Sequence, residues 1–335
     1  MSWLGLDIGG ANLKAASAAG WAKTMPFALW RDPNGLASAL NALMEGAPSA
    51  DRLAVTMTGE LCDCFRTKEE GVLHILSAVR EVANGREVCV YLVDGRLVSL
   101  EGAMSSPILA AASNWRALAE FACRFVPTGA GLLIDIGSTT TDIIPIENGR
   151  VTARGRSDIE RLAAGELVYS GVGRTPICAL VRALPWRGQM CPVAAEVFAT
   201  TADAYLVLGE VGEDRTADWT ADGRPLTIEC ARQRLARQLC ADAGDFAAED
   251  FKRMARGVRE CQLRTLTNAI QATKCGMSTT AGTAVVSGTG EFMAGAAVES
   301  VWPGWGIQSL AERLGHQTSR CGPAFALAML ADRGR

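Results

Sequence analysis

Two short segments of the sequence place an acid, glycine and neutral hydrogen-bond donors in the same order. The first runs Asp7-Ile8-Gly9-Gly10-Ala11-Asn12-Leu13-Lys14, and the second begins 128 residues later as Asp135-Ile136-Gly137-Ser138-Thr139-Thr140-Thr141-Asp142. Glycine at a tight turn lets main-chain N–H groups approach an anion closely, and neutral side chains add donors without adding negative charge. The residues expected to bind phosphate are therefore Gly9, Gly10, Asn12, Gly137, Ser138, Thr139 and Thr140.

The aspartate before each turn needs a different role, because a carboxylate repels phosphate. We expect Asp7 and Asp135 to hold Mg²⁺, whose charge then faces the anion. Lys14 follows Asn12 by two residues, so both side chains lie on one face of a strand, and the lysine supplies a mobile positive charge. A single segment of this kind is often only a hairpin turn, but two copies with flanking donors indicate an anion site.

The elements around these segments predict an α/β fold built twice. Each segment is typical of an apolar strand, a small-residue turn and a second strand. Their separation is too long for a solenoid repeat and favours two similar domains, each opening with the same β-hairpin. Alternating strands and helices elsewhere support the α/β class. Further strands are expected at 53–58, 88–93 and 283–287, and helices from 36 onward, at 74–82, at 113–125 with Ser113 as N-cap, and at 309–330.

Composition breaks at 127–131, a Pro-Thr-Gly-Ala-Gly run, and this sets the predicted domain boundary. The first domain is expected at 1–127, joined by C-terminal helices at about 307–335. The second is expected at 128–306, with a helical insertion at about 180–260. Within the insertion, Arg232, Arg234 and Arg237 are expected on a solvated helix face. A third glycine-rich turn after the strand at 283–287 places Gly288 and Gly290 among the candidate ligand contacts.

Charge and composition exclude several classes of protein. The chain has 33 basic and 36 acidic residues without a long run of either sign, so we expect no nucleic-acid partner. We expect no membrane span and no signal peptide, because no apolar stretch is long enough and the first residues include an acid. Eleven cysteines without a CxxC pair, and two histidines, indicate a reducing cytoplasm rather than disulfides or zinc. The sequence leaves open whether the chain forms a homodimer.

The order of the glycine-rich turns resembles that of the actin-like ATPase superfamily. The resemblance implies two duplicated actin-like (ribonuclease H-like) domains with a ligand cleft between them. A narrower resemblance extends over about residues 3–330 and is to the tetrahydromethanopterin-linked one-carbon-transfer pathway proteins. These belong to the hydantoinase/oxoprolinase-like branch, and their archaeal relatives are methanofuran synthases. The segments that carry it are 56–65, 93–95, 112–115, 134–146, 165–172, 174–176 and 220–225.

This family resemblance implies a diphosphate-releasing transferase. The donor is an (aminomethyl)furanylmethyl diphosphate, the acceptor is the phenol of a γ-glutamyltyramine-like or tyrosine-derived amine, and Mg²⁺ assists. Loss of diphosphate from a furan-bearing CH₂ has a cation-like transition state, which needs a neutralised leaving group and protection from water. Trp115 or another aromatic ring is a candidate to stabilise that cation, with an ordinary core position as the alternative.

A phenol has a pKa near 10, so a carboxylate base within hydrogen-bond reach would assist its attack. Glu60 and Asp63, just after a strand end, are the first candidates, and helix-terminal acids are the alternative reading of both. Glu166 and Asp203 are second choices. Arg174 is a candidate for the acceptor's carboxylate, although a lone arginine is often a surface residue, and Asn114 completes the expected substrate contacts.

Two other functions remain open at the level of the sequence. One is an ATP-dependent kinase or hydantoinase/oxoprolinase-type enzyme of the same fold, in which the turn at 287–290 contacts adenosine. The other is a non-catalytic partner that keeps the fold as an interaction module. His74 and His316 have no acid or nucleophile partner in the sequence and are assigned no role.

Overall fold

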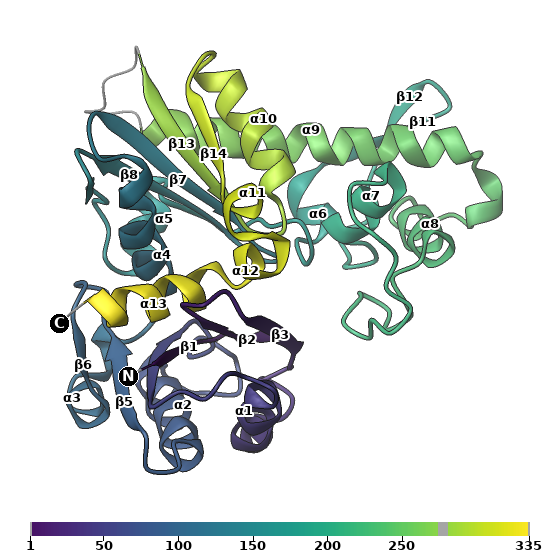
Figure 1. Cartoon of the computed structure of the whole chain (residues 1–335). Helices are drawn as coiled ribbons and strands as arrows, with labels where there is room; N and C mark the ends of the chain where they lie inside the picture. The colour runs from purple at the N-terminus through teal and green to yellow at the C-terminus, as the bar shows by residue number, and fades with distance from the viewer. Residues whose placement is uncertain (1, 274–280, 334–335) are drawn as a thin grey trace.

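The computed structural model describes residues 2–273 and 281–333. Two sheets form two lobes, one above the other, and a third group of helices extends sideways from the second lobe (Figure 1). The first sheet is built from residues before 100, and the second is built from residues after 129. Each sheet opens on one of the two predicted hairpins.

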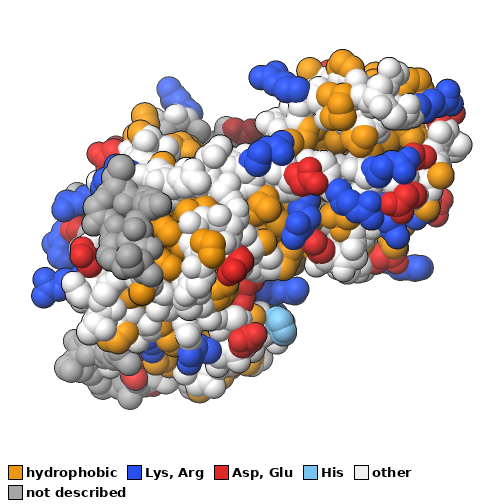
Figure 2. Space-filling view, turned by 90° about the horizontal axis from the view of Figure 1, so that it is seen from above, with side chains coloured by type: hydrophobic (Ala, Val, Ile, Leu, Met, Phe, Trp, Pro, Cys, Tyr) orange, Lys and Arg blue, Asp and Glu red, His pale blue; other side chains and the backbone are white. Residues whose placement is uncertain are grey.

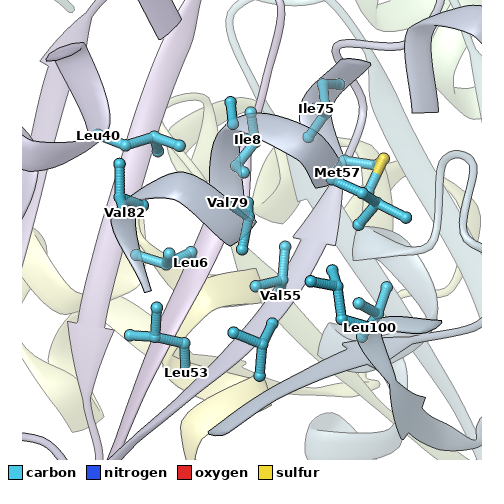
Figure 3. Close-up of a cluster of buried hydrophobic side chains, with 14 of the residues drawn as sticks. Leu6, Ile8, Leu40, Leu53, Val55, Met57, Ile75, Val79, Val82 and Leu100 are labelled. Atoms are coloured by element: carbon cyan, nitrogen blue, oxygen red, sulfur yellow. The ribbon is translucent and has the colours of Figure 1, made fainter. Parts of the chain in front are cut away.

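The first sheet has the strand order β3-β2-β1-β4-β5-β6. β1 pairs antiparallel with β2 and parallel with β4. Helices α1 and α2 cover one face, where Leu6, Val55 and Val79 are buried together (Figure 3). The elements of this lobe are β1 (Trp3–Ile8), β2 (Asn12–Ser17), β3 (Ala22–Pro26), η1 (Pro33–Gly35), α1 (Leu36–Met44), β4 (Arg52–Met57), α2 (Lys68–Val82), β5 (Glu87–Tyr91), β6 (Leu97–Ser99), α3 (Leu100–Met104) and η2 (Pro107–Leu109).

The second sheet repeats this plan. Its order is β10-β8-β7-β13-β14, and β9 also pairs with β8. β7 pairs antiparallel with β8 and parallel with β13, as β1 does with β2 and β4. The elements are β7 (Ala130–Ile136), β8 (Thr141–Glu147), β9 (Arg150–Val151), α5 (Asp158–Ala164), β10 (Leu167–Val168), β13 (Gly282–Ser287), α10 (Glu291–Val301), β14 (Gly306–Ser309), α11 (Leu310–Leu314) and α12 (His316–Arg320). The prediction of an α/β fold built twice is confirmed.

Helices α4 (Asn114–Ala122) and α13 (Gly322–Arg333) lie between the two sheets (Figure 1). α13 approaches β1 so closely that a Cβ on Gly5 would lie 1.9 Å from the carbonyl oxygen of Ala324. Buried residues of both sheets, including Ala16 and Leu133, share one apolar cluster with these helices. The short helix η3 (Cys123–Phe125) follows α4 directly. Residues near the C-terminus therefore help to hold the two lobes together.

The lateral extension differs from its prediction in two ways. The segment from 180 onward, predicted to be mostly helical, begins with a β-hairpin that the sequence did not indicate. In addition, Arg234 is fully buried, not solvated, and forms ion pairs with Asp203 (2.7 Å) and Asp222 (2.9 Å). A helix-face pattern could not show this, because the aspartates come from other segments. The elements are α6 (Ile177–Leu180), β11 (Ala183–Trp186), β12 (Gln189–Pro192), α7 (Thr201–Leu208), α8 (Ile228–Arg237), η4 (Ala243–Asp245) and α9 (Ala248–Thr273).

None of the described helices combines the length and apolar character needed to span a bilayer. On the face drawn in Figure 2, Lys and Arg side chains alternate with Asp and Glu along the extension. This mixture agrees with the near-balanced charge of the chain.

Candidate active site

The two glycine turns have the same main-chain geometry. In the first, Gly9 N–H donates to the carbonyl of Asn12 (3.1 Å), and in the second, Gly137 N–H donates to the carbonyl of Thr140 (2.9 Å). Each turn joins two antiparallel strands, and its residues are partly exposed. The repeat seen in the sequence is therefore a structural repeat, and both turns are open enough to contact a ligand.

Charged residues occupy equivalent places on the two hairpins. Asp7 is the cross-strand partner of Lys14, and Asp135 is the cross-strand partner of Asp142. Lys14 Nζ lies 3.6 Å from Asp7 Oδ2. Although burial lowers the pKa of Lys14, the charges of Asp7 and Asp135 outweigh it and the net pKa shift is upward. Lys14 from the first lobe thus interacts with carboxylates of both lobes.

The three carboxylates repel one another in a buried setting. Burial raises the pKa of Asp7, which is 3% exposed, and the charge of Asp142 adds to this. Burial and then the charge of Asp142 raise the pKa of Asp135 to about 6, against the opposing effect of Lys14. Asp7 interacts electrostatically with Asp142 and Lys14 with Asp135, so charged groups of one hairpin act on those of the other.

The buried side chain of Arg161 compensates part of this negative charge. Its guanidinium hydrogen bonds to Asp142 and lies 4.2 Å from the ring centroid of Trp115. It also forms a 3.7 Å ion pair with Asp158. Neither Arg161 nor Asp142 was predicted from the sequence, although Asp142 is 128 residues from Lys14, the same spacing that relates the two aspartates.

These residues fit a magnesium ion. Asp7 Oδ1 is buried and has no hydrogen-bond partner, and the three carboxylates outnumber the cations of Lys14 and Arg161. The described residues contain no cluster of three or more His, Cys, Asp or Glu with metal-ligand geometry. Mg²⁺ needs only one or two protein carboxylates when phosphate and water supply the rest. Asp7 and Asp135 therefore remain the proposed ligands.

A second pair of equivalent residues lies on the strand beside each aspartate. Thr56 of β4 is paired in register with Asp7, and Ser287 of β13 with Asp135. The sequence then continues as Thr58-Gly59-Glu60 in one lobe and Thr289-Gly290-Glu291 in the other. Glycine is required at 290 because a Cβ there would lie 2.4 Å from Ile136. The third glycine-rich turn is thus the second-lobe counterpart of the segment that carries Glu60.

Glu60 is a buried acid at the meeting of the lobes. It is 1% exposed, and its Oε2 has no hydrogen-bond partner. Burial raises the pKa of Glu60 to about 7, with opposing smaller effects from Asp158 and Lys68. Lys68 and Asp158 come from different lobes and form a 2.9 Å ion pair. Asp63, the rival candidate, is exposed.

The N-terminus of α4 completes the surroundings of Glu60. The main chain of Ala112, which has a positive φ of 48°, lowers the pKa of Glu60 and so opposes part of the effect of burial. Ser113 does not cap the helix through its side chain as predicted but hydrogen bonds to Thr56 (2.8 Å). Asn114 instead accepts a bond from the N–H of Trp115, and its partial exposure leaves it available to a ligand.

Three predicted substrate contacts are buried and contact other groups of the protein. Trp115 is 1% exposed within the layer between the sheets, and Arg161 lies over its ring. This burial favours the alternative that Trp115 is an ordinary core residue. Glu166 is fully buried, and its oxygens accept from the N–H groups of Arg154 (2.6 Å) and Gly155 (3.0 Å). Asp203 is committed to Arg234 and to the N-terminus of α7. Their partners are distant in sequence or formed by main chain, so composition could not reveal them.

Arg174 and the Gly288 turn do lie beside the second hairpin. Arg174 N–H donates to the carbonyl of Ser138 (2.8 Å). Gly288 has a φ of +90°, and a Cβ there would lie 2.7 Å from Asp135 Oδ1. Sequence reasoning missed Trp30, whose ring centroid lies 4.6 Å from the Arg174 guanidinium. A tryptophan in a loop has no periodic pattern that identifies it.

Fold and site together define an α/β protein with the same sheet plan in two lobes and a glycine turn in each. The chain belongs to the hydantoinase/oxoprolinase family, whose model matches residues 51–333. It is 34% identical to the (4-{4-[2-(gamma-L-glutamylamino)ethyl]phenoxymethyl}furan-2-yl)methanamine synthase of Methanocaldococcus jannaschii, over 98% of this chain and 96% of that protein. The enzyme of the same name from Methanococcus vannielii is 31% identical, over 63% of this chain and 95% of that protein.

Solved structures similar to this chain include a ROK family glucokinase from Streptomyces griseus in complex with glucose and AMPPNP. It is 14% identical, both chains are covered completely, and the TM-score is 0.48. The archaeal actin homologue Ta0583 in complex with ADP has the same identity, coverage and TM-score.

Proposed function

We propose that this protein is a synthase in the formation of a methanofuran-type cofactor. It joins an (aminomethyl)furanylmethyl diphosphate to the phenol oxygen of a γ-glutamyltyramine-like or tyrosine-derived acceptor. The observation that carries the proposal is the pair of equivalent glycine turns, each bordered by an aspartate and a cross-strand charged partner, with Lys14 of one hairpin interacting electrostatically with Asp135 of the other. The names of the two archaeal relatives supply the product class.

The turns and Lys14 act on the leaving group. Diphosphate departs with the electron pair of the CH₂–O bond, and main-chain N–H groups and the Lys14 ammonium stabilise the charge that develops. Mg²⁺ held by Asp7 and Asp135 would add positive charge to the same oxygens. The hydroxyls of Ser138, Thr139 and Thr140 add donors at the second turn. These groups are positioned before the reaction, so little reorganisation accompanies it.

Glu60 is the proposed general base. As the phenol oxygen forms its bond to the furan-bearing CH₂, the phenol proton passes to the Glu60 carboxylate. A carboxylate with a pKa near 7 is a stronger base than an exposed glutamate, and about half of it is ionised at neutral pH. Asp63 is exposed to solvent, so the geometry favours the buried Glu60.

A product assay tests the proposal. The chain is incubated with Mg²⁺, the furanylmethyl diphosphate and γ-glutamyltyramine, and aryl ether and diphosphate are measured together. The expected result is equal amounts of both, with neither formed when the acceptor is omitted. Absence of ether under conditions in which the Methanocaldococcus jannaschii enzyme forms it would contradict the proposal. Mg²⁺-dependent hydrolysis of ATP, or its use to phosphorylate a substrate, would favour the kinase or hydantoinase-type alternative.

A further inference from the structure

Each glycine turn is fixed by hydrogen bonds to a second loop. At the first turn, the N–H groups of Phe27 and Leu29 donate to the carbonyls of Ala11 (3.1 Å) and Gly10 (2.9 Å). At the second turn, the N–H groups of Gly173 and Arg174 both donate to the carbonyl of Ser138, at 2.9 and 2.8 Å. The two supporting loops are therefore attached to the ligand-binding turns of their own lobes.

The loop at the second turn has almost no freedom of its own. A Cβ on Gly171 would lie 2.5 Å from the carbonyl oxygen of Gly137, and one on Gly173 would lie 2.3 Å from Ser138 Oγ. Thr175 fixes the loop further by accepting from the N–H of Gly171 (2.8 Å). The main chain of Arg174 thus keeps a constant position relative to the turn, and only its side chain extends to the other lobe.

The side chain of Arg174 meets Trp30 of the first lobe. The guanidinium lies 4.6 Å from the indole centroid, and both residues are partly exposed. Among the residues described, no carboxylate forms an ion pair with Arg174. The charge of Arg174 also acts on Cys62 of the first lobe. Burial raises the pKa of the Cys62 thiol, and Arg174 opposes this by a smaller amount. Cys62 Sγ in turn lies 2.6 Å from where a Cβ on Gly10 would be.

We propose that Arg174 binds the diphosphate where the two turns meet, and that Trp30 positions it there. The inference rests on the proposed function and deepens it, because it assigns Arg174 to the leaving group rather than to the acceptor's carboxylate. A guanidinium without a carboxylate partner is free to form bidentate hydrogen bonds to phosphate oxygens. The indole face of Trp30, in the first lobe, holds the guanidinium of Arg174, in the second, by a cation–π interaction that does not neutralise its charge.

The pair also makes diphosphate a link between the lobes. The first lobe contributes the Gly9 turn and Trp30, and the second contributes the Gly137 turn and Arg174. An anion held by both turns and by Arg174 is bound well only when the lobes have the arrangement seen here. Trp30 is a positioning residue in this scheme, since it acts through Arg174.

The test is the affinity of the full chain for inorganic diphosphate in the presence of Mg²⁺, measured by calorimetry. We expect Arg174→Met to weaken binding by about 10- to 100-fold, as for loss of a charged hydrogen-bond pair, and Arg174→Lys to weaken it less. Trp30→Leu should weaken it by about 3- to 10-fold, and Trp30→Phe should restore most of the affinity because it keeps an aromatic face.

The extension offers a matched control. Arg187 lies 4.9 Å from the ring centroid of Trp186, away from both turns, so Arg187→Met and Trp186→Leu should leave diphosphate affinity unchanged. Circular dichroism of every variant identifies any that fails to fold. If the wild type binds diphosphate and the Arg174 and Trp30 variants bind it equally well, the proposed role of Arg174 and Trp30 is refuted while the proposed function stands. If the wild type does not bind diphosphate, the proposed function itself fails.

Discussion

Asp135→Asn is expected to lower kcat/KM for aryl ether formation by at least about 1,000-fold. The amide keeps the size of the side chain and its cross-strand place opposite Asp142 but removes the charge that would hold Mg²⁺. The loss should appear mainly in kcat, because the charge on the leaving diphosphate is greatest in the transition state. Steady-state kinetics at saturating Mg²⁺ measure this, with Asp7→Asn expected to show a loss of similar size.

The control for Asp135→Asn is Glu147→Gln, which removes an exposed carboxylate from the end of the neighbouring strand β8. This variant should retain wild-type activity. The Asp135→Asn protein should be at least as stable as the wild type, because burial and the charge of Asp142 oppose ionisation of Asp135. Retention of more than about one tenth of the activity by both Asp7→Asn and Asp135→Asn would contradict the role given to these two aspartates.

Glu60→Gln is expected to lower kcat by about 100- to 10,000-fold, the usual range for loss of a general base. A base acts when it is deprotonated, and the pKa of Glu60 is raised by burial to about 7. Wild-type activity should therefore rise with pH through about 7, and the residual activity of Glu60→Gln should lack this rise. Asp63→Asn is the matched control and should change kcat by less than about tenfold.

Stability provides an independent check on the same residue. The pKa of Glu60 is higher in the folded protein than its ordinary value of 4.5, so its stabilising contribution is complete below pH 4.5 and is lost as the pH rises through about 7. Above that range the free energy of unfolding of Glu60→Gln should exceed that of the wild type by up to about 3 kcal/mol. The variant should therefore unfold at a higher denaturant concentration. An inactive variant that is also less stable at pH 8 would contradict this account and indicate a structural role.

The sequence was informative where function depends on a local pattern. The two hairpins, the duplication and the α/β class follow from strand periodicity and from glycine at a turn, and Asp7 and Asp135 lie at the strand ends where the pattern put them. The structure adds a second repeat, Thr58-Gly59-Glu60 and Thr289-Gly290-Glu291, that the same comparison would have found. Local patterns fixed the candidate turns because their geometry involves only neighbouring residues.

Contacts between distant segments could not be predicted in this way. Arg234 looks solvated from its helix alone, and its burial depends on Asp203 and Asp222. Trp115 and Trp30 are equally aromatic in the sequence, but packing between the sheets covers the first and leaves the second beside a turn. The role of such a side chain depends on which other helix or strand packs against it. A single sequence does not show which distant segments are in contact.

A crystal structure of the protein with Mg²⁺ and diphosphate tests the central claim most directly. The account predicts one diphosphate that accepts hydrogen bonds from main-chain N–H groups of both the 9–12 and the 137–140 turns, with a magnesium ion between it and the carboxylates of Asp7 and Asp135. Diphosphate bound to one turn only, or at a place that touches neither, would contradict it.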